Sequence, residues 1–104
     1  MPQKRNAQAI EVKPAMDRIL TAGEFYFVHH EDKPDIHAGM VHACPCGCGA
    51  HSALWFSGQG RGRPEWNVAG EWPNVTLSPS IGIRKSAGDF HWHGYLRNGV
   101  FEEI

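Results

Sequence analysis

The feature that most constrains this chain is a run of three cysteines, each separated by one residue, in the segment Cys44-Pro45-Cys46-Gly47-Cys48. Thiolates are soft, charged ligands that suit Zn²⁺. The proline fixes one backbone angle and the glycines permit tight bends, so the sulfurs can curl around one ion. Because three thiols cannot all pair with one another, and because no secretory signal precedes them, they are typical of metal ligands rather than disulfides. The segment, which we call the cysteine knuckle (residues 44–49), predicts a zinc site.

A tetrahedral zinc ion needs a fourth ligand, and the histidines near the C-terminus offer one. His91 and His93 lie at positions i and i+2 of an expected strand, so they share one face of it. We expect the ligands to be Cys44, Cys46, Cys48 and His93. A competing set replaces one cysteine by His91, and His51 is a further candidate. A closed Cys₃His site is structural, whereas a catalytic zinc keeps one position open for water. Because there are more candidate ligands than the four places around the ion, the sequence leaves open whether the zinc is structural or catalytic.

The rest of the chain predicts short strands and tight turns. Its 104 residues are the length of one domain, and 12 glycines and 7 prolines are more than a helical protein would carry. Asn98-Gly99 is a strong type I′ hairpin signal. The expected strands span residues 24–29, 40–43, 51–56, 65–68, 75–77, 90–96 and 100–104. We therefore expect a mostly β fold, a small antiparallel sheet or sandwich of hairpins with little helix, stapled by zinc in the cysteine knuckle.

The domain boundaries follow from the same pattern. Residues 1–21 are polar and irregular, and we expect a partly irregular N-terminal arm. Residues 22–104 are expected to form the zinc-binding β domain. No apolar run of membrane-spanning length occurs and the first 20 residues lack the apolar core of a signal peptide, so we expect a cytoplasmic protein without a membrane partner.

Other functional patterns are weaker. The net charge of −1 gives no broad attraction to nucleic acid. Arg61 and Arg63 in a glycine-rich loop, followed by Trp66, could contact phosphate and stack on a base, which makes them the candidates for a weak nucleic-acid site. Ser78 and Ser80 have no His/Asp relay nearby in sequence, so the sequence alone does not favour a serine nucleophile and predicts no catalytic residue.

Three separated motifs resemble one known family. They are the cysteine knuckle, the segment 75–82, and His93 followed by residues 97–99. Together they resemble a small bacterial and phage family of unknown function, number six-five-two-seven among such domains and sometimes mislabelled as ammonia monooxygenase. The resemblance covers residues 22–101. It implies a zinc-binding β domain whose ligands fall on the three cysteines and His93. The family usually has a further cysteine just upstream of that histidine, a position where His91 can substitute here.

The resemblance also bears on function. Some members are encoded beside E1-like, E2-like and JAB-type proteins of bacterial ubiquitin-like conjugation, and others are encoded by phages. We expect a small zinc-binding module with a structural metal site that docks on a protein partner of a phage or a bacterial conjugation system, rather than an enzyme. The alternatives are a zinc-dependent hydrolase, a nucleic-acid-binding accessory protein, or a phage virion component in which zinc only holds the fold together.

Overall fold

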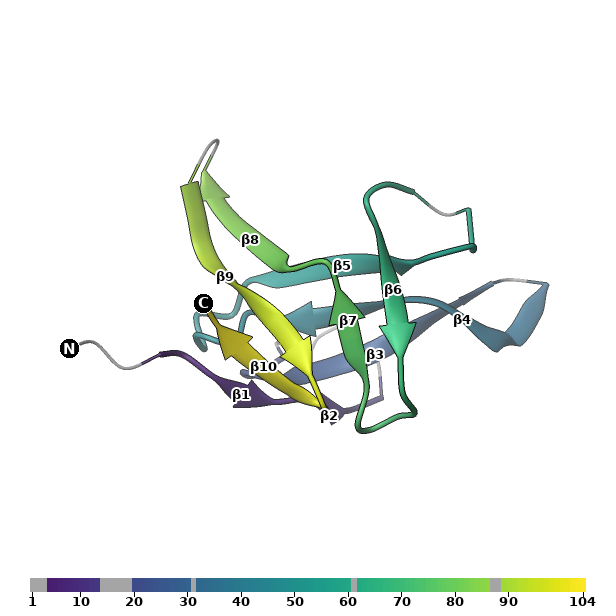
Figure 1. Cartoon of the computed structure of the whole chain (residues 1–104), viewed down its shortest axis with the longest axis horizontal. Coiled ribbons are helices and arrows are strands. Elements are labelled where there is room, and N and C mark those ends of the chain that lie inside the picture. The colour runs from purple at the N-terminus through teal and green to yellow at the C-terminus, as the bar shows by residue number, and fades with distance from the viewer. Residues whose placement is uncertain (1–3, 14–19, 31, 61, 87–88) are drawn as a thin grey trace.

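The structure of the chain is a computed structural model that describes residues 4–13, 20–30, 32–60, 62–86 and 89–104. Across these ranges the chain forms strands and no helix, as the sequence predicted (Figure 1). The strands are β1 (Ala7–Gln8), β2 (Ile10–Glu11), β3 (Glu24–His30), β4 (Lys33–Ala43), β5 (His51–Phe56), β6 (Glu65–Ala69), β7 (Thr76–Ser78), β8 (Ile81–Ser86), β9 (Asp89–Arg97) and β10 (Val100–Glu103). They build two sheets.

The first sheet has the strand order β1-β10-β9-β8 and is antiparallel throughout. Asn98 and Gly99 connect β9 to β10 with φ angles of 48° and 79°. A type I′ turn requires positive φ at both central residues, so the predicted hairpin is confirmed. The second sheet has the order β2-β3-β4-β5-β6-β7 and is antiparallel except for the parallel pairs β2–β3 and β5–β6.

Two very short strands near the N-terminus join the two sheets. In β1, Ala7 pairs with Phe101 of the four-stranded sheet, and in β2, Ile10 pairs with Glu24 of the six-stranded sheet. Two-residue strands are too short to show a hydrophobic period, so they could not be predicted from the sequence. Residues 1–3 and 14–19 of the expected arm lie outside the described part of the chain.

Strand β4 is longer than expected. The strand expected over residues 40–43 already begins at Lys33 and runs to Ala43, through Pro34. Its first residues pair irregularly with β3, with register shifts on both sides of His29. Proline is tolerated near the start of a strand, where ladder bonds are few or irregular, so it did not end the pairing here.

The core lies between the sheets and takes side chains from both. The alternation of strand residues places Trp92 and Phe101 of the four-stranded sheet, and Met40 and Leu54 of the six-stranded sheet, at 2% exposure or less. His42 is also fully buried, and its ring stacks on that of Phe101 with a centroid separation of 4.9 Å.

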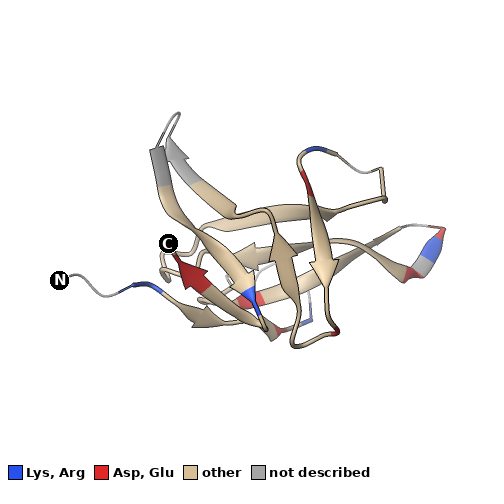
Figure 2. Ribbon diagram, in the orientation of Figure 1, with Lys and Arg blue, Asp and Glu red and all other residues tan. Residues whose placement is uncertain are grey.

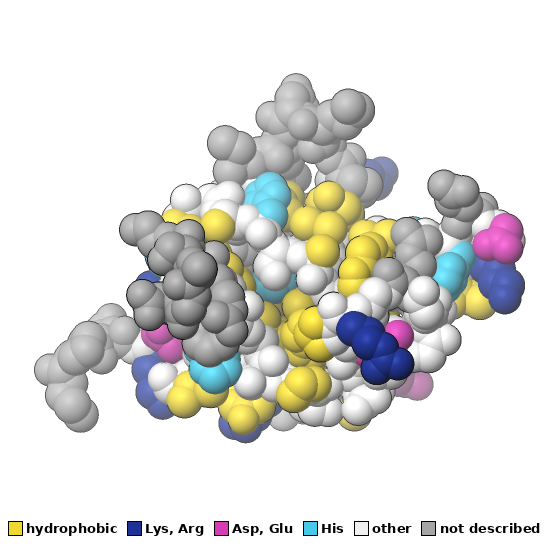
Figure 3. Space-filling model, turned by 90° about the horizontal axis from the view of Figure 1, so that it is seen from above, with side chains coloured by type: hydrophobic (Ala, Val, Ile, Leu, Met, Phe, Trp, Pro, Cys, Tyr) yellow, Lys and Arg dark blue, Asp and Glu magenta, His cyan; other side chains and the backbone are white. Residues whose placement is uncertain are grey.

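Charged residues of both signs are spread along the described ribbon, without a dense run of basic residues (Figure 2). On the face seen in Figure 3, hydrophobic side chains gather near the centre, and charged side chains lie beside them and at both ends. Among the described residues, no helix is long and apolar enough to cross a membrane.

Candidate metal centre and an adjacent Ser-His pair

The cysteine knuckle connects β4 to β5, at the tip of a hairpin, as expected. The N–H of Cys44 donates to the carbonyl of Ala50 at 2.7 Å, and the N–H of Gly47 donates to the carbonyl of Cys44 at 3.0 Å. Gly47 and Gly49 have φ angles of 86° and 90°, a conformation that residues with a Cβ rarely adopt. The two glycines therefore permit the curled backbone that turns the three thiols toward one another.

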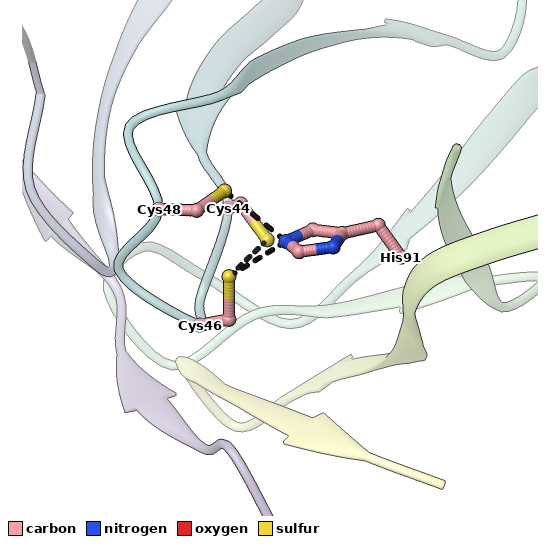
Figure 4. A group of neighbouring side chains, drawn as sticks. All are labelled: Cys44, Cys46, Cys48 and His91. Carbon is pink, nitrogen blue, oxygen red and sulfur yellow. Dashed lines mark hydrogen bonds between the residues drawn. The ribbon is translucent and has the colours of Figure 1, made fainter. Parts of the chain in front are cut away.

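His91 completes this group (Figure 4). Its Nε2 lies 2.9 Å from the Sγ of Cys46 and 3.2 Å from the Sγ of Cys48, and the Sγ atoms of Cys44 and Cys46 are 3.2 Å apart. All four ligand atoms lie within 4.8 Å of one another. A tetrahedral zinc site with bonds of 2.0–2.3 Å has edges of about 3.5–3.8 Å, which falls inside this spread. The Cys₃His cluster could therefore hold a metal ion, and its donor set is consistent with zinc.

A β-bulge explains why His91 reaches the cysteines. In the β8–β9 ladder, Ile83 pairs with Trp92 and Arg84 pairs with Phe90, so His91 is an extra residue without a partner of its own on β8. A bulge re-aims a side chain that regular pleating would direct elsewhere. Here it directs the imidazole of His91 toward the knuckle and connects β9 to the β4–β5 hairpin.

Arg5 supports the same cluster from the N-terminal side. Its Nη2 donates to the carbonyl of His91 at 2.9 Å and to the Oε2 of Glu103 at 2.6 Å. The pKa of Arg5 is raised, mainly by its hydrogen bonds to Glu103 and further by the nearby thiols of Cys46 and Cys44. Three thiolates around a divalent ion carry a net charge of −1, so a cation beside them is favourable.

The thiols differ in their environment. Burial raises the pKa of Cys44 to about 12. Cys48 is exposed, and the N–H of Ala50, which donates to its sulfur at 3.5 Å, lowers its pKa to about 7. Because a metal binds the thiolate, binding must release the proton of Cys44, and affinity must fall at low pH.

His93, which the sequence offered as the fourth ligand, does not belong to this group of ligand atoms. Its Nε2 lies 2.9 Å from the Oγ of Ser80, the residue immediately before β8. The indole Nε1 of Trp66 donates to the carbonyl of Ser80 at 3.3 Å. A serine hydroxyl in hydrogen-bond contact with an imidazole is the arrangement that activates a nucleophile in serine hydrolases.

The structure thus separates two neighbouring histidines into two sites. His91 joins the cysteines and His93 joins Ser80, and the two residues are separated by about 7 Å of strand. Sequence reasoning missed the Ser80–His93 pair because the two residues are 13 positions apart and meet only through the pairing of β8 with β9. The signal that could have revealed it is the pair Ile81 and Ile83 on either side of Gly82, which indicates a strand that starts just after Ser80.

The remaining sequence candidates lie elsewhere. The Nε2 of His51 accepts a hydrogen bond from the N–H of Leu20 at 3.2 Å. Trp66 is only 8% exposed, so its ring packs in the core and offers no free face for a base to stack on. Arg63 is exposed, and Arg61 lies outside the described residues. The nucleic-acid site expected from these residues therefore stays a prediction without support from the described residues.

Comparison with known proteins gives one match. The model of a family described as "Bacterial ubiquitination-like system serine protease (BubE)" matches residues 11–104. No curated protein and no solved structure matches the chain. The resemblance seen in the sequence also indicated a bacterial family connected with ubiquitin-like conjugation, and the match agrees with it to that extent. The family number inferred from sequence and the link to phages stay predictions.

Proposed function

Because this chain belongs to the BubE family of bacterial ubiquitination-like system serine proteases, we propose that it is a serine hydrolase with Ser80 as nucleophile and His93 as general base. The observation that carries the proposal is the 2.9 Å contact between the Oγ of Ser80 and the Nε2 of His93. The family description supports it independently, because it names the reaction class that such a pair performs.

The mechanism follows from the position of the two groups. The Oγ of Ser80 attacks the carbonyl carbon of the scissile bond while the Nε2 of His93 takes the hydroxyl proton. The imidazolium then gives that proton to the leaving amine or alcohol, and an acyl-serine remains. Water, deprotonated by the same imidazole, releases the acid and restores the serine.

Backbone contacts hold both residues in place. The carbonyl of His93 accepts a hydrogen bond from the N–H of Ile104 at 2.9 Å, which holds β9 against the end of the chain. The carbonyl of Ser80 accepts the hydrogen bond of Trp66, whose ring is fixed in the core. Such fixed positions reduce the cost of aligning nucleophile and base for reaction.

The substrate in this proposal is the amide or ester bond that joins a ubiquitin-like protein to another group, as the family description suggests. The protein partner expected from the sequence is then the ubiquitin-like protein or its conjugate. Docking on this partner would be transient, as for any substrate, and the reaction would take place in the bacterial cytoplasm.

The Cys₃His cluster has a structural role in this proposal. Cys44, Cys46, Cys48 and His91 would hold a zinc ion with four protein ligands, which leaves no position for a reacting water. When bound, the ion contributes folding free energy, about 10 kcal/mol or more for a site of this kind. This arrangement supports the structural zinc expected from the sequence and argues against a zinc-dependent hydrolase.

The test is the hydrolysis of p-nitrophenyl acetate, a small ester that requires only nucleophile and base. Ser80→Ala should lower kcat by about 10³-fold or more, and His93→Ala by a similar factor. The matched control is Ser78→Ala, because Ser78 is exposed and lies two residues away in β7. Loss of activity in the control, or full activity in Ser80→Ala, would contradict the proposal.

A further inference from the structure

Strand β8 lies at the end of the four-stranded sheet and, among the described residues, pairs with β9 alone. The β8–β9 hairpin projects from the rest of the molecule (Figure 1). The strand begins at Ile81, directly after Ser80. An edge strand presents unpaired N–H and C=O groups that can accept a further strand. The proposed nucleophile therefore stands at the start of an open sheet edge.

The hydrogen bonds of β9 show which backbone groups face that edge. The carbonyl of His93 accepts from the N–H of Ile104, so it points toward β10 and away from β8. The N–H and C=O of one strand residue point to the same side, so the N–H of His93 also points toward β10. His93 therefore exchanges no backbone hydrogen bonds with Gly82, its partner on β8, and the two form a non-hydrogen-bonded pair. The N–H and C=O of Gly82 therefore point away from β9, toward the outer edge.

The side chains around Gly82 leave this edge accessible. Ile81 and Ile83 are 0% and 6% exposed and point into the core, whereas Gly82 is exposed and lies on the same face as His93. Since Gly82 has no side chain, space remains beside the imidazole for a side chain of a bound strand.

We propose that the substrate polypeptide binds in an extended conformation as an additional strand along β8, hydrogen-bonded to the N–H and C=O of Gly82. Two residues of strand, about 7 Å, separate Gly82 from Ser80. A peptide paired with Gly82 would thus bring its scissile carbonyl to the serine about two residues away. This inference rests on the proposed function and names its substrate form: an extended terminal segment of a protein, recognised mainly through its backbone.

The test compares Gly82→Pro with Gly82→Ala. Proline removes the N–H of residue 82, but if that N–H points outward the β8–β9 ladder keeps all its bonds, and proline is tolerated in an edge strand of this kind. Gly82 is not among the glycines with positive φ, so its backbone conformation accepts the side chain of alanine. Alanine adds a Cβ to the same face and keeps the N–H, which makes it the matched control.

Two probes are needed: p-nitrophenyl acetate, and fluorescence-quenched peptides with two or six randomised residues before the scissile bond. We expect the wild type to cleave the longer peptides at least about fivefold more efficiently, since each backbone hydrogen bond contributes about that factor. Gly82→Pro should lower kcat/KM for the longer peptides about fivefold relative to Gly82→Ala, with equal rates on the ester. Equal peptide rates in the two variants would overturn the inference.

A second measurement uses the wild type alone, so it does not depend on how the proline variant folds. Peptides N-methylated at one backbone amide at a time should show one position where methylation lowers kcat/KM by a similar factor. No sensitive position, combined with no effect of peptide length, would also overturn the inference. Failure of the wild type to hydrolyse the ester and the peptides would instead overturn the proposed function itself.

Discussion

His91 and His93 provide a matched pair of substitutions that separates the two sites. They are the same residue type, two positions apart on β9, but His91 contacts the cysteine sulfurs and His93 contacts Ser80. We expect His91→Ala to impair zinc binding and stability, and His93→Ala to impair hydrolysis. Each variant serves as the control for the other.

The magnitude follows from the number of ligands. His91 supplies one of the four ligand atoms. If a structural zinc contributes about 10 kcal/mol and the ligands share it equally, His91→Ala costs about 2.5 kcal/mol. For a domain of this size that lowers Tm by about 10–20 °C. His93→Ala removes the half-buried hydrogen bond to Ser80, a loss that should cost about 1 kcal/mol.

The assays are the zinc content per chain, thermal unfolding followed by circular dichroism, and ester hydrolysis at a temperature where both variants are folded. The expected pattern is reduced zinc and Tm in His91→Ala, with normal zinc and absent hydrolysis in His93→Ala. The opposite pattern, with zinc lost in His93→Ala and kept in His91→Ala, would refute the reasoning and restore the ligand set first expected from the sequence.

Three further predictions concern the fold. A chelator that removes zinc should lower the Tm of the wild type by more than His91→Ala does, measured in the same buffer; an unchanged Tm would show that no structural metal is present. Gly94→Ala should prevent folding or cost more than about 3 kcal/mol in urea unfolding, because its Cβ would lie 2.1 Å from the carbonyl oxygen of Glu102 and 2.6 Å from the ring of Trp92; a cost near zero would contradict the β9–β10 packing. Hydrogen bonds from Arg5 lower the pKa of Glu103, so the ion pair stabilises the fold above the pKa of Glu103 in the unfolded chain, and this stabilisation is lost as the pH falls through its pKa in the folded protein. Glu103→Gln should therefore cost about 0.2–1 kcal/mol at pH 7 and nothing near pH 2. An equal cost at both pH values would exclude the ion pair as the source of the stabilisation.

Much of the fold was predictable because local signals agreed with the final structure. Strand β5 begins and ends at the predicted residues, since it is rich in apolar and aromatic residues and glycines lie near both of its ends. Asn98-Gly99 forms the expected turn because few other dipeptides accept positive φ at both positions. The clustering of the three cysteines followed from their spacing and from the proline and glycines of the knuckle.

The parts that were not predictable depend on pairing between distant residues. A regular strand puts His91 and His93 on one face, and nothing in the sequence showed that a bulge at His91 would divide them between two sites. Ser80 looked like an ordinary residue of a Ser-Pro-Ser turn, because the register that brings His93 to it is set by the whole β8–β9 ladder. The sequence offered both His93 and His91 as the ligand from the distant strand, and it could not choose between them because the choice depends on this bulge.

The most direct test of a reactive Ser80 is covalent labelling with a fluorophosphonate, followed by peptide mapping with mass spectrometry. The reagent modifies serines that a neighbouring base activates. We predict a single adduct on Ser80 in the wild type and in Ser78→Ala, and no adduct in His93→Ala. An unmodified wild-type protein, or an adduct on another residue that persists in His93→Ala, would contradict the assignment of Ser80 and His93 as a nucleophile and its base.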